Sequence, residues 1–214
     1  MNTILHIDTS GPDALIGISQ DLKIIASKQN SQSNTHGEFV QAGVDELFRD
    51  SATQLKDIDA IGVTMGPGSY TGLRVGLASA KGLAFALNKP LIGLSTLTLL
   101  AKAAVGHLTA TENPLVNEKQ LQVFSMIDAR RMEIFGAIYN SSLGYLAAEK
   151  AMILDEALLL ALLSNGPLIC IGSGVAKTKI LTQHADFHNY SPLFLDCSYT
   201  IHNMAALAMI KFKA

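Results

Sequence analysis

Three glycines within seven residues, Gly66, Gly68 and Gly72, stand where a protein could bind phosphate. They follow an apolar run, residues 60–65, whose length and β-branched side chains predict a buried strand. Residues 77–88, rich in Ala and Leu, come next and predict a helix. A glycine turn between a strand and a helix N-terminus offers unpaired backbone N–H groups and a favourable helix dipole to an anion. A nucleotide site is therefore the first hypothesis to test.

The spacing of this segment excludes the common nucleotide motifs. A P-loop consists of a glycine, four further residues and then Gly-Lys-Ser/Thr. In this chain Leu73 and Arg74 follow Gly72, so the lysine and the hydroxyl residue are missing. A dinucleotide-binding turn requires Gly-x-Gly-x-x-Gly, and its third glycine would fall on Thr71. Ser69 does not match the Gly-x-Ser-x-Gly pattern of a nucleophilic serine either, so it is interpreted as a helix N-cap.

A row of small residues remains to be explained. Gly72, Gly76, Ala80 and Ala84 recur every four residues and therefore share one helix face. Glycine inside a helix costs about 0.5–1 kcal/mol relative to alanine, so two of them on one stripe indicate close approach by another element. Periodicity alone leaves open whether that element belongs to the same chain or to a partner.

Two aspartates could do acid–base or metal chemistry. Asp8 ends one apolar run and is followed by Thr9 and Ser10, and Asp128 ends another. The competing interpretation, which we favour, is that each aspartate caps its own turn. His36 is followed four residues later by Val40, so no His-x-x-x-His metal pair is present there. We therefore expect no catalytic residue, no metal site and no cofactor.

The amino-acid composition limits which binding partners and which cellular compartment can be expected. The chain has 214 residues, 49% of them apolar, and a formal net charge of −2, which provides no basic surface for nucleic acid. Its two cysteines have no metal-ligand spacing and are typical of reduced thiols. The start of the chain lacks the pattern of a signal peptide, and the apolar run 157–163 is too short to span a membrane. We expect a cytoplasmic protein without a membrane partner.

The chain divides into two halves of similar pattern, 1–108 and a smaller 109–214. A polar stretch, 109–114, separates them, and an apolar run ending in Ile-Asp opens each half. The elements expected in the first half are strands at 4–7, 14–19, 23–27, 60–65 and 91–94, and helices at 35–48 (capped by Thr35), 69–84 (the glycine helix) and 97–105. Strands at 123–128 and 134–138 open the second half.

Three segments, Ile4–Ser10, Gly66–Gly76 and Ile127–Arg130, resemble the TsaB (YeaZ) family of bacterial proteins needed to make threonylcarbamoyladenosine in tRNA. The resemblance implies an α/β fold, the actin-like ATPase (ribonuclease H-like) fold, with two duplicated βββαβαβα halves. In such ATPases two Asp turns handle phosphate and magnesium. Here Ala129 and Arg130 stand where the ATPases place glycine, so the nucleotide cleft is expected to be degenerate. Its vestigial residues would be Asp8, Thr9, Ser10 and Asp128.

The resemblance also implies a function without catalysis. The chain would be a scaffold that binds a TsaD-type catalytic subunit and supports recruitment of a TsaE-type P-loop ATPase. The complex transfers threonylcarbamoyl to the adenosine beside the anticodon, and tRNA would contact this chain only indirectly. Alone, the chain is expected to form a homodimer through the same surface. Two alternatives stay open: a stand-alone actin-fold ATPase or kinase using Asp8 and Asp128, and a homodimeric regulator with no tRNA role.

Two sets of residues follow from this interpretation. The partner surface is expected on the helix 35–48 and the glycine helix, at Phe39, Val40, Val44, Tyr70, Gly72, Leu73, Gly76, Leu77 and Ala80. The motif turn that begins the glycine helix comprises Gly66, Pro67, Gly68, Ser69, Thr71 and Arg74.

Overall fold

The computed structural model describes residues 1–32, 36–183, 187 and 191–214. The chain forms two compact units, one of Met1–Leu99 with Tyr199–Ala214 and one of Leu100–Ser198. This division differs from the expected halves, because residue 108 lies inside helix α3 (Thr96–Ala110) and helix α6 (Ile201–Lys213) belongs to the first unit. Within the described residues, no helix is long and apolar enough to cross a membrane.

The first unit is built on a five-stranded sheet in the order β3-β2-β1-β4-β5. Strands β1, β2 and β3 are antiparallel neighbours, whereas β1, β4 and β5 run parallel. Because β1 pairs on both sides and both sheet faces are covered, all of its residues are buried. The strands are β1 (Thr3–Asp8), β2 (Ala14–Gln20), β3 (Lys23–Asn30), β4 (Ala60–Gly66) and β5 (Leu91–Ser95).

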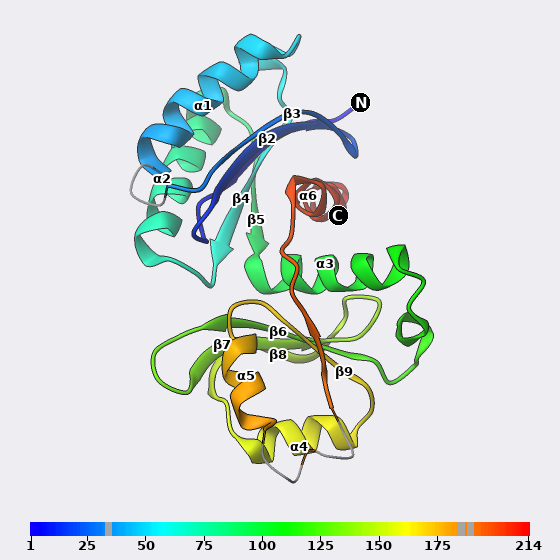
Figure 1. Cartoon of the computed structure of the whole chain (residues 1–214). Coiled ribbons are helices and arrows are strands. Elements are labelled where there is room, and N and C mark those ends of the chain that lie inside the picture. The colour runs from blue at the N-terminus through cyan, green and yellow to red at the C-terminus, as the bar shows by residue number, and fades with distance from the viewer. Residues whose placement is uncertain (33–35, 184–186, 188–190) are drawn as a thin grey trace. The chain divides into compact units, whose positions relative to one another are not determined.

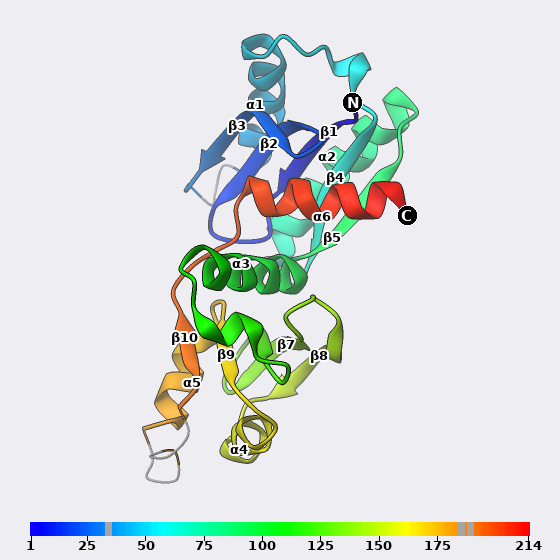
Figure 2. The ribbon, with the colours of Figure 1, turned by 90° about the vertical axis from the view of Figure 1, so that its right-hand side faces the viewer.

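Helices α1 (His36–Asp50) and α2 (Tyr70–Leu87) cover one face of this sheet, and α6 crosses the other (Figures 1 and 2). Helix α2 begins after Ser69, whose hydroxyl accepts from the Gly72 N–H, and it ends at Asn88 in a left-handed conformation. The expected cap of α1, Thr35, lies outside the described residues. A short 3₁₀ helix, η2 (Leu55–Asp57), precedes β4.

The second unit has its own five-stranded sheet, in the order β10-β9-β6-β7-β8. Most of α3 and the 3₁₀ helix η3 (Pro114–Asn117) precede the sheet. Helix α4 (Glu156–Ser164), capped by Asp155, and helix α5 (Val175–Leu181) pack on it through an apolar core. The strands are β6 (Gln122–Asp128), β7 (Glu133–Tyr139), β8 (Tyr145–Ile153), β9 (Leu168–Ile171) and β10 (Leu193–Leu195).

The two halves repeat one plan. Each runs βββαβαβα along the chain, and each sheet has the same order of strands, third-second-first-fourth-fifth. In each sheet the first three strands are antiparallel and the later ones are added in parallel. This is the actin-like, ribonuclease H-like fold, and the expected duplication is confirmed.

Candidate functional site

The glycine segment packs on the turn that follows β1 in the same unit. The Ser69 N–H donates to the carbonyl oxygen of Ser10 at 2.7 Å, and the Thr9 hydroxyl donates to the carbonyl oxygen of Gly72 at 2.6 Å. A Cβ added at Gly68 would overlap the Ser10 carbonyl, and one at Gly72 would overlap the Thr9 carbonyl. These glycines therefore let the start of α2 lie backbone against backbone on the turn.

The small-residue row of α2 faces this same unit, which corrects part of the expected partner surface. Gly72, Gly76, Ala80 and Ala84 are all buried. A Cβ at Gly76 would overlap the hydroxyl oxygen of Thr9. Gly72, Gly76 and Ala80 thus allow close approach of a helix to its own sheet, and they offer no surface to a partner.

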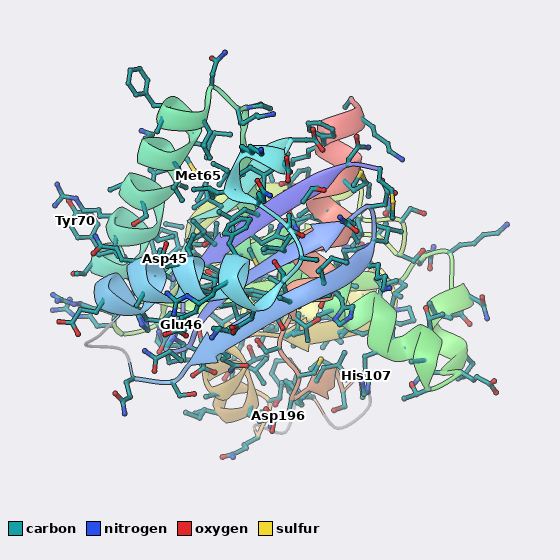
Figure 3. The ribbon with its side chains drawn as sticks, turned by 90° about the horizontal axis from the view of Figure 1, so that it is seen from above. Asp45, Glu46, Met65, Tyr70, His107 and Asp196 are labelled. Atoms are coloured by element: carbon teal, nitrogen blue, oxygen red, sulfur yellow. The ribbon has the colours of Figure 1, made fainter. Side chains whose placement is uncertain are left out.

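The other expected partner residues are mostly covered as well. Val40 and Val44 belong to the apolar core of the first unit, while Phe39, Leu73 and Leu77 are half-buried. Tyr70 differs, because 73% of it is exposed. The Arg74 guanidinium lies 5.2 Å from the centre of its ring, an arrangement that orients the ring at the surface. Figure 3 shows Tyr70 projecting outward from α2.

The outer faces of α1 and α2 form a shallow groove of about 360 Å³. Ala78 and Gly82 line its α2 side and, with Ala86 one turn further along the helix, form a second row of small residues, all exposed. A Cβ at Gly82 would meet no atom within 4 Å. This outer row is not among the residues predicted from the sequence, although its spacing of four residues matches that of the inner row. The groove is lined by Val40, Gln41, Val44, Asp45, Leu55, Ala78, Ser79, Gly82 and Leu83.

Asp8 is buried and accepts four hydrogen bonds within its own unit. Its Oδ1 atom accepts from the Ser10 N–H at 2.9 Å, the Ser10 hydroxyl at 2.7 Å and the Thr64 hydroxyl at 2.6 Å. Its Oδ2 atom accepts from the Tyr199 hydroxyl at 2.7 Å. Burial, together with the negative charge of Asp8, raises the pKa of Tyr199, so this hydroxyl stays protonated as a donor. The carboxylate thus holds the Asp8–Ser10 turn in place.

Asp128 is held by a lysine of the second unit. The Lys177 ammonium forms an ion pair with Asp128 and donates to the carbonyl oxygens of Ala129 at 2.9 Å and Glu133 at 2.8 Å. The Asp128 N–H donates to the Ser173 hydroxyl at 2.8 Å. A cation of the chain itself therefore neutralises this turn. Each of the two aspartates anchors a turn of its own unit.

The side chains described here include no group of three His, Cys, Asp or Glu residues that could hold a metal ion. Burial raises the pKa of the Cys170 thiol to about 12. Burial and, after it, the neighbouring Asp196 raise the pKa of Cys197. Both thiols are therefore protonated at neutral pH, whereas nucleophilic catalysis requires a thiolate.

Comparisons with known proteins agree with the fold. The family model described as TsaD, tRNA N6-adenosine threonylcarbamoyltransferase, matches residues 23–170. The TsaB protein of Escherichia coli is 33% identical over 64% of this chain, and that of Bacillus subtilis is 31% identical over 74%. Both are called tRNA threonylcarbamoyladenosine biosynthesis protein TsaB. The matched stretch spans only 54% and 63%, respectively, of those two relatives.

A solved structure, YeaZ from Pseudomonas aeruginosa, superposes with a TM-score of 0.75 at 23% identity. The superposition covers 99% of this chain and 92% of that one, so both units and their topology are shared. The family model matches more than half of the chain, including the glycine turn and the Asp128 turn. The chain therefore belongs to the family of the tRNA N6-adenosine threonylcarbamoyltransferase model, and it is similar to TsaB (YeaZ) proteins in sequence and in fold.

Proposed function

We propose that this chain is a non-catalytic scaffold subunit in the synthesis of threonylcarbamoyladenosine in tRNA. It binds a TsaD-type catalytic subunit and supports recruitment of a TsaE-type P-loop ATPase. The names of the curated relatives support the pathway. The match to the TsaD model supports a partner of the same fold, because homologous surfaces readily pair about a two-fold or pseudo-two-fold axis.

The observation that carries this proposal is the groove between α1 and α2. Its outer row, Ala78, Gly82 and Ala86, lets a second helix approach closely, and Tyr70 provides a large exposed aromatic anchor at the start of α2. Phe85, 91% exposed, adds apolar area near the other end of the helix. In the absence of a TsaD-type partner, the same face of a second copy takes its place, so the isolated chain forms a homodimer.

The state of the two Asp turns supports a role without catalysis. Asp8 accepts four hydrogen bonds from donors of its own unit, and Asp128 forms an ion pair with Lys177. Both carboxylates are therefore engaged within their own units, which disfavours their use as magnesium ligands. The net charge of −2 supports contact with tRNA only through the complex.

The docking face is tested by Gly82→Arg, which fills the groove without touching the core. Its matched control is Gly106→Arg on α3, where an added Cβ likewise meets no atom within 4 Å. Both variants should fold, because each removes an exposed glycine from a helix. Gly82→Arg should weaken capture of a TsaD-type subunit at least tenfold, whereas Gly106→Arg should bind as the wild type does. Equal binding by both variants would place the partner elsewhere.

Two further measurements test the remaining parts of the proposal. Size-exclusion chromatography should show a homodimer that Gly82→Arg converts to a monomer and that a TsaD-type subunit converts to a heterodimer. Purified chain with ATP and magnesium should release no phosphate above a protein-free control. Phosphate release that Asp128→Asn abolishes would instead support the stand-alone ATPase.

A further inference from the structure

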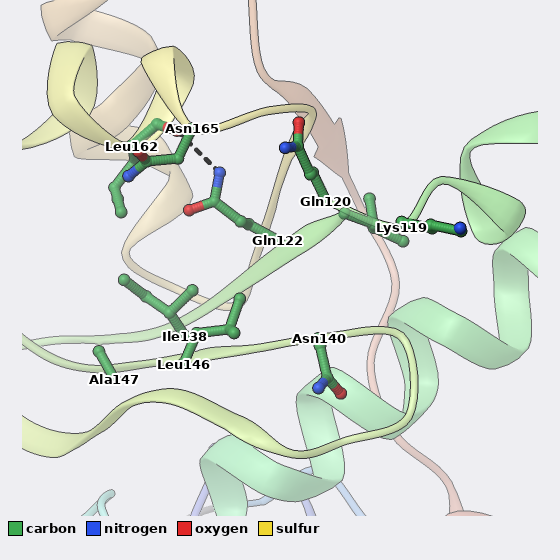
Figure 4. A pocket seen from close by; sticks show the side chains of 10 residues that line it. Lys119, Gln120, Gln122, Ile138, Asn140, Leu146, Ala147, Leu162 and Asn165 are labelled. Carbon is green, nitrogen blue, oxygen red and sulfur yellow. Dashed lines mark hydrogen bonds between the residues drawn. The ribbon is translucent and has the colours of Figure 1, made fainter.

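The second unit contains a hollow of about 480 Å³ that none of the functions above uses. It lies between the C-terminal end of α4 and the strands β6, β7 and β8 (Figure 4). Ile138, Leu146, Ala147 and Leu162 provide its apolar wall. A hollow of this volume falls within the range of small-molecule sites in proteins, which are mostly apolar with a few placed polar groups.

One buried polar side chain, Gln122, is directed into this hollow. Only 5% of Gln122 is exposed. Its Nε2 group donates to the carbonyl oxygens of Leu162 at 2.7 Å and Gly166 at 3.4 Å, which uses both amide hydrogens and fixes the orientation of the amide. Figure 4 shows the amide oxygen turned away from the Leu162 carbonyl, toward the apolar wall. The Gln122 Oε1 atom therefore lies beside the apolar wall as a hydrogen-bond acceptor that a ligand can reach from the hollow.

The charged and polar groups at the rim do not enter the hollow. Figure 4 shows Lys119 and Asn140 extending away from its centre. The Asn140 Oδ1 atom accepts from the N–H groups of Ser142 and Gly144 in the β7–β8 turn, which explains its direction. Lys119 belongs to the lining, but its side chain extends away from the centre, so the inner wall presents neutral groups and suits a neutral ligand.

We propose that this hollow binds a neutral, planar molecule of nucleobase size that carries an N–H donor. The N–H group bonds to the Gln122 Oε1 atom, and the ring lies against Ile138, Leu146 and Ala147. Asn165, at the mouth, can bond to a second polar edge of the ring through its exposed amide. The site is separate from the turn that holds Asp128, so its occupation does not depend on the proposed scaffold role.

The chemistry is tested with adenosine as the probe, by saturation-transfer NMR and calorimetry on the whole chain. Adenosine should bind, and purine riboside, which lacks the exocyclic amine, should bind about tenfold more weakly because one hydrogen bond to a buried acceptor is lost. Absence of adenosine binding would overturn the proposal. Equal binding of the two nucleosides would overturn the role given to Gln122.

The location is tested with a matched pair of variants on β8. Ala147→Phe fills the hollow, whereas Ala148→Phe places the same ring on the adjacent, exposed residue, which does not line it. Ala147→Phe should abolish adenosine binding, and Ala148→Phe should leave it unchanged. Leu146→Asp, at a half-exposed wall position, supplies a second variant that folds even if Ala147→Phe does not. Adenosine binding retained by folded Ala147→Phe or by Leu146→Asp would refute this location.

Discussion

Two glycines of helix α2, six residues apart, should respond to alanine with opposite signs. A Cβ at Gly76 would overlap the hydroxyl oxygen of Thr9, whereas a Cβ at Gly82 would meet no atom within 4 Å. Both substitutions gain about 0.5–1 kcal/mol because alanine is the better helix former. At Gly82 nothing opposes that gain, so Gly82→Ala should stabilise the protein by about that amount.

At Gly76 the gain is outweighed. The Thr9 hydroxyl donates to the Gly72 carbonyl at 2.6 Å, and moving it aside forfeits a buried hydrogen bond, about 0.5–1.5 kcal/mol. Overpacking of the contact between α2 and the turn adds about 1–3 kcal/mol. After the helix gain is subtracted, Gly76→Ala should lower the free energy of unfolding by about 0.5–4 kcal/mol.

Urea unfolding and thermal unfolding, both followed by circular dichroism, measure the two variants against the wild type. Their melting temperatures should differ by on the order of 10 °C for a chain of this size. Gly76→Ala should keep its affinity for a TsaD-type subunit at temperatures where it is folded. If Gly76→Ala proved neutral in stability but lost the partner, the inner row would face outward and the packing described for α2 would be refuted.

Three further predictions follow from buried or partnered polar groups. Burial lowers the pKa of His6 to about 3, so between pH 7 and pH 3 the unfolded state binds a proton that the folded state does not. The free energy of unfolding should therefore fall by about 2 kcal/mol from pH 7 to pH 5. In urea titrations, His6→Asn should lose that part of the pH dependence. Tyr199→Phe removes the donor to Asp8 Oδ2 and should destabilise the protein by about 1–3 kcal/mol; an unchanged midpoint in urea would show that this bond contributes nothing. Lys177→Met removes three contacts around Asp128, so hydrogen exchange of the backbone amides in that turn should accelerate, while the amides of the first unit keep their exchange rates. An equal increase in exchange rate across the whole chain would contradict a local role for Lys177.

The local features of the fold were predictable from the sequence. Short apolar runs bounded by turn residues predict strands at 4–7, 14–19 and 60–65, and all three lie inside the observed β1, β2 and β4. The Ile-Asp ending of residues 127–128 marked the repeat, because the same hairpin opens both sheets. These signals are carried by neighbouring residues, so no tertiary information is needed to find them.

Features that depend on distant residues were not predictable. The spacing of Gly72 and Gly76 shows that something approaches closely, but the element that does so is Thr9, more than sixty residues earlier. Periodicity could not rank this inner row against the outer row through Gly82, because both have the same spacing. The partners Lys177 and Tyr199 likewise reach their aspartates only through the sheet topology.

The placement of α6 in the first unit affects the order in which the two units fold during synthesis. Ile201, Met204 and Ala208 complete an apolar cluster with residues of β1, β4 and β5, yet roughly one hundred residues of the second unit are translated between β5 and α6. At a translation rate of about 5–20 residues per second, the sheet face that α6 covers stays exposed for on the order of ten seconds. The second unit, continuous in sequence, can close first on the ribosome. We therefore expect the nascent chain to fold from its middle outward, with the first unit exposed to chaperones until α6 has emerged.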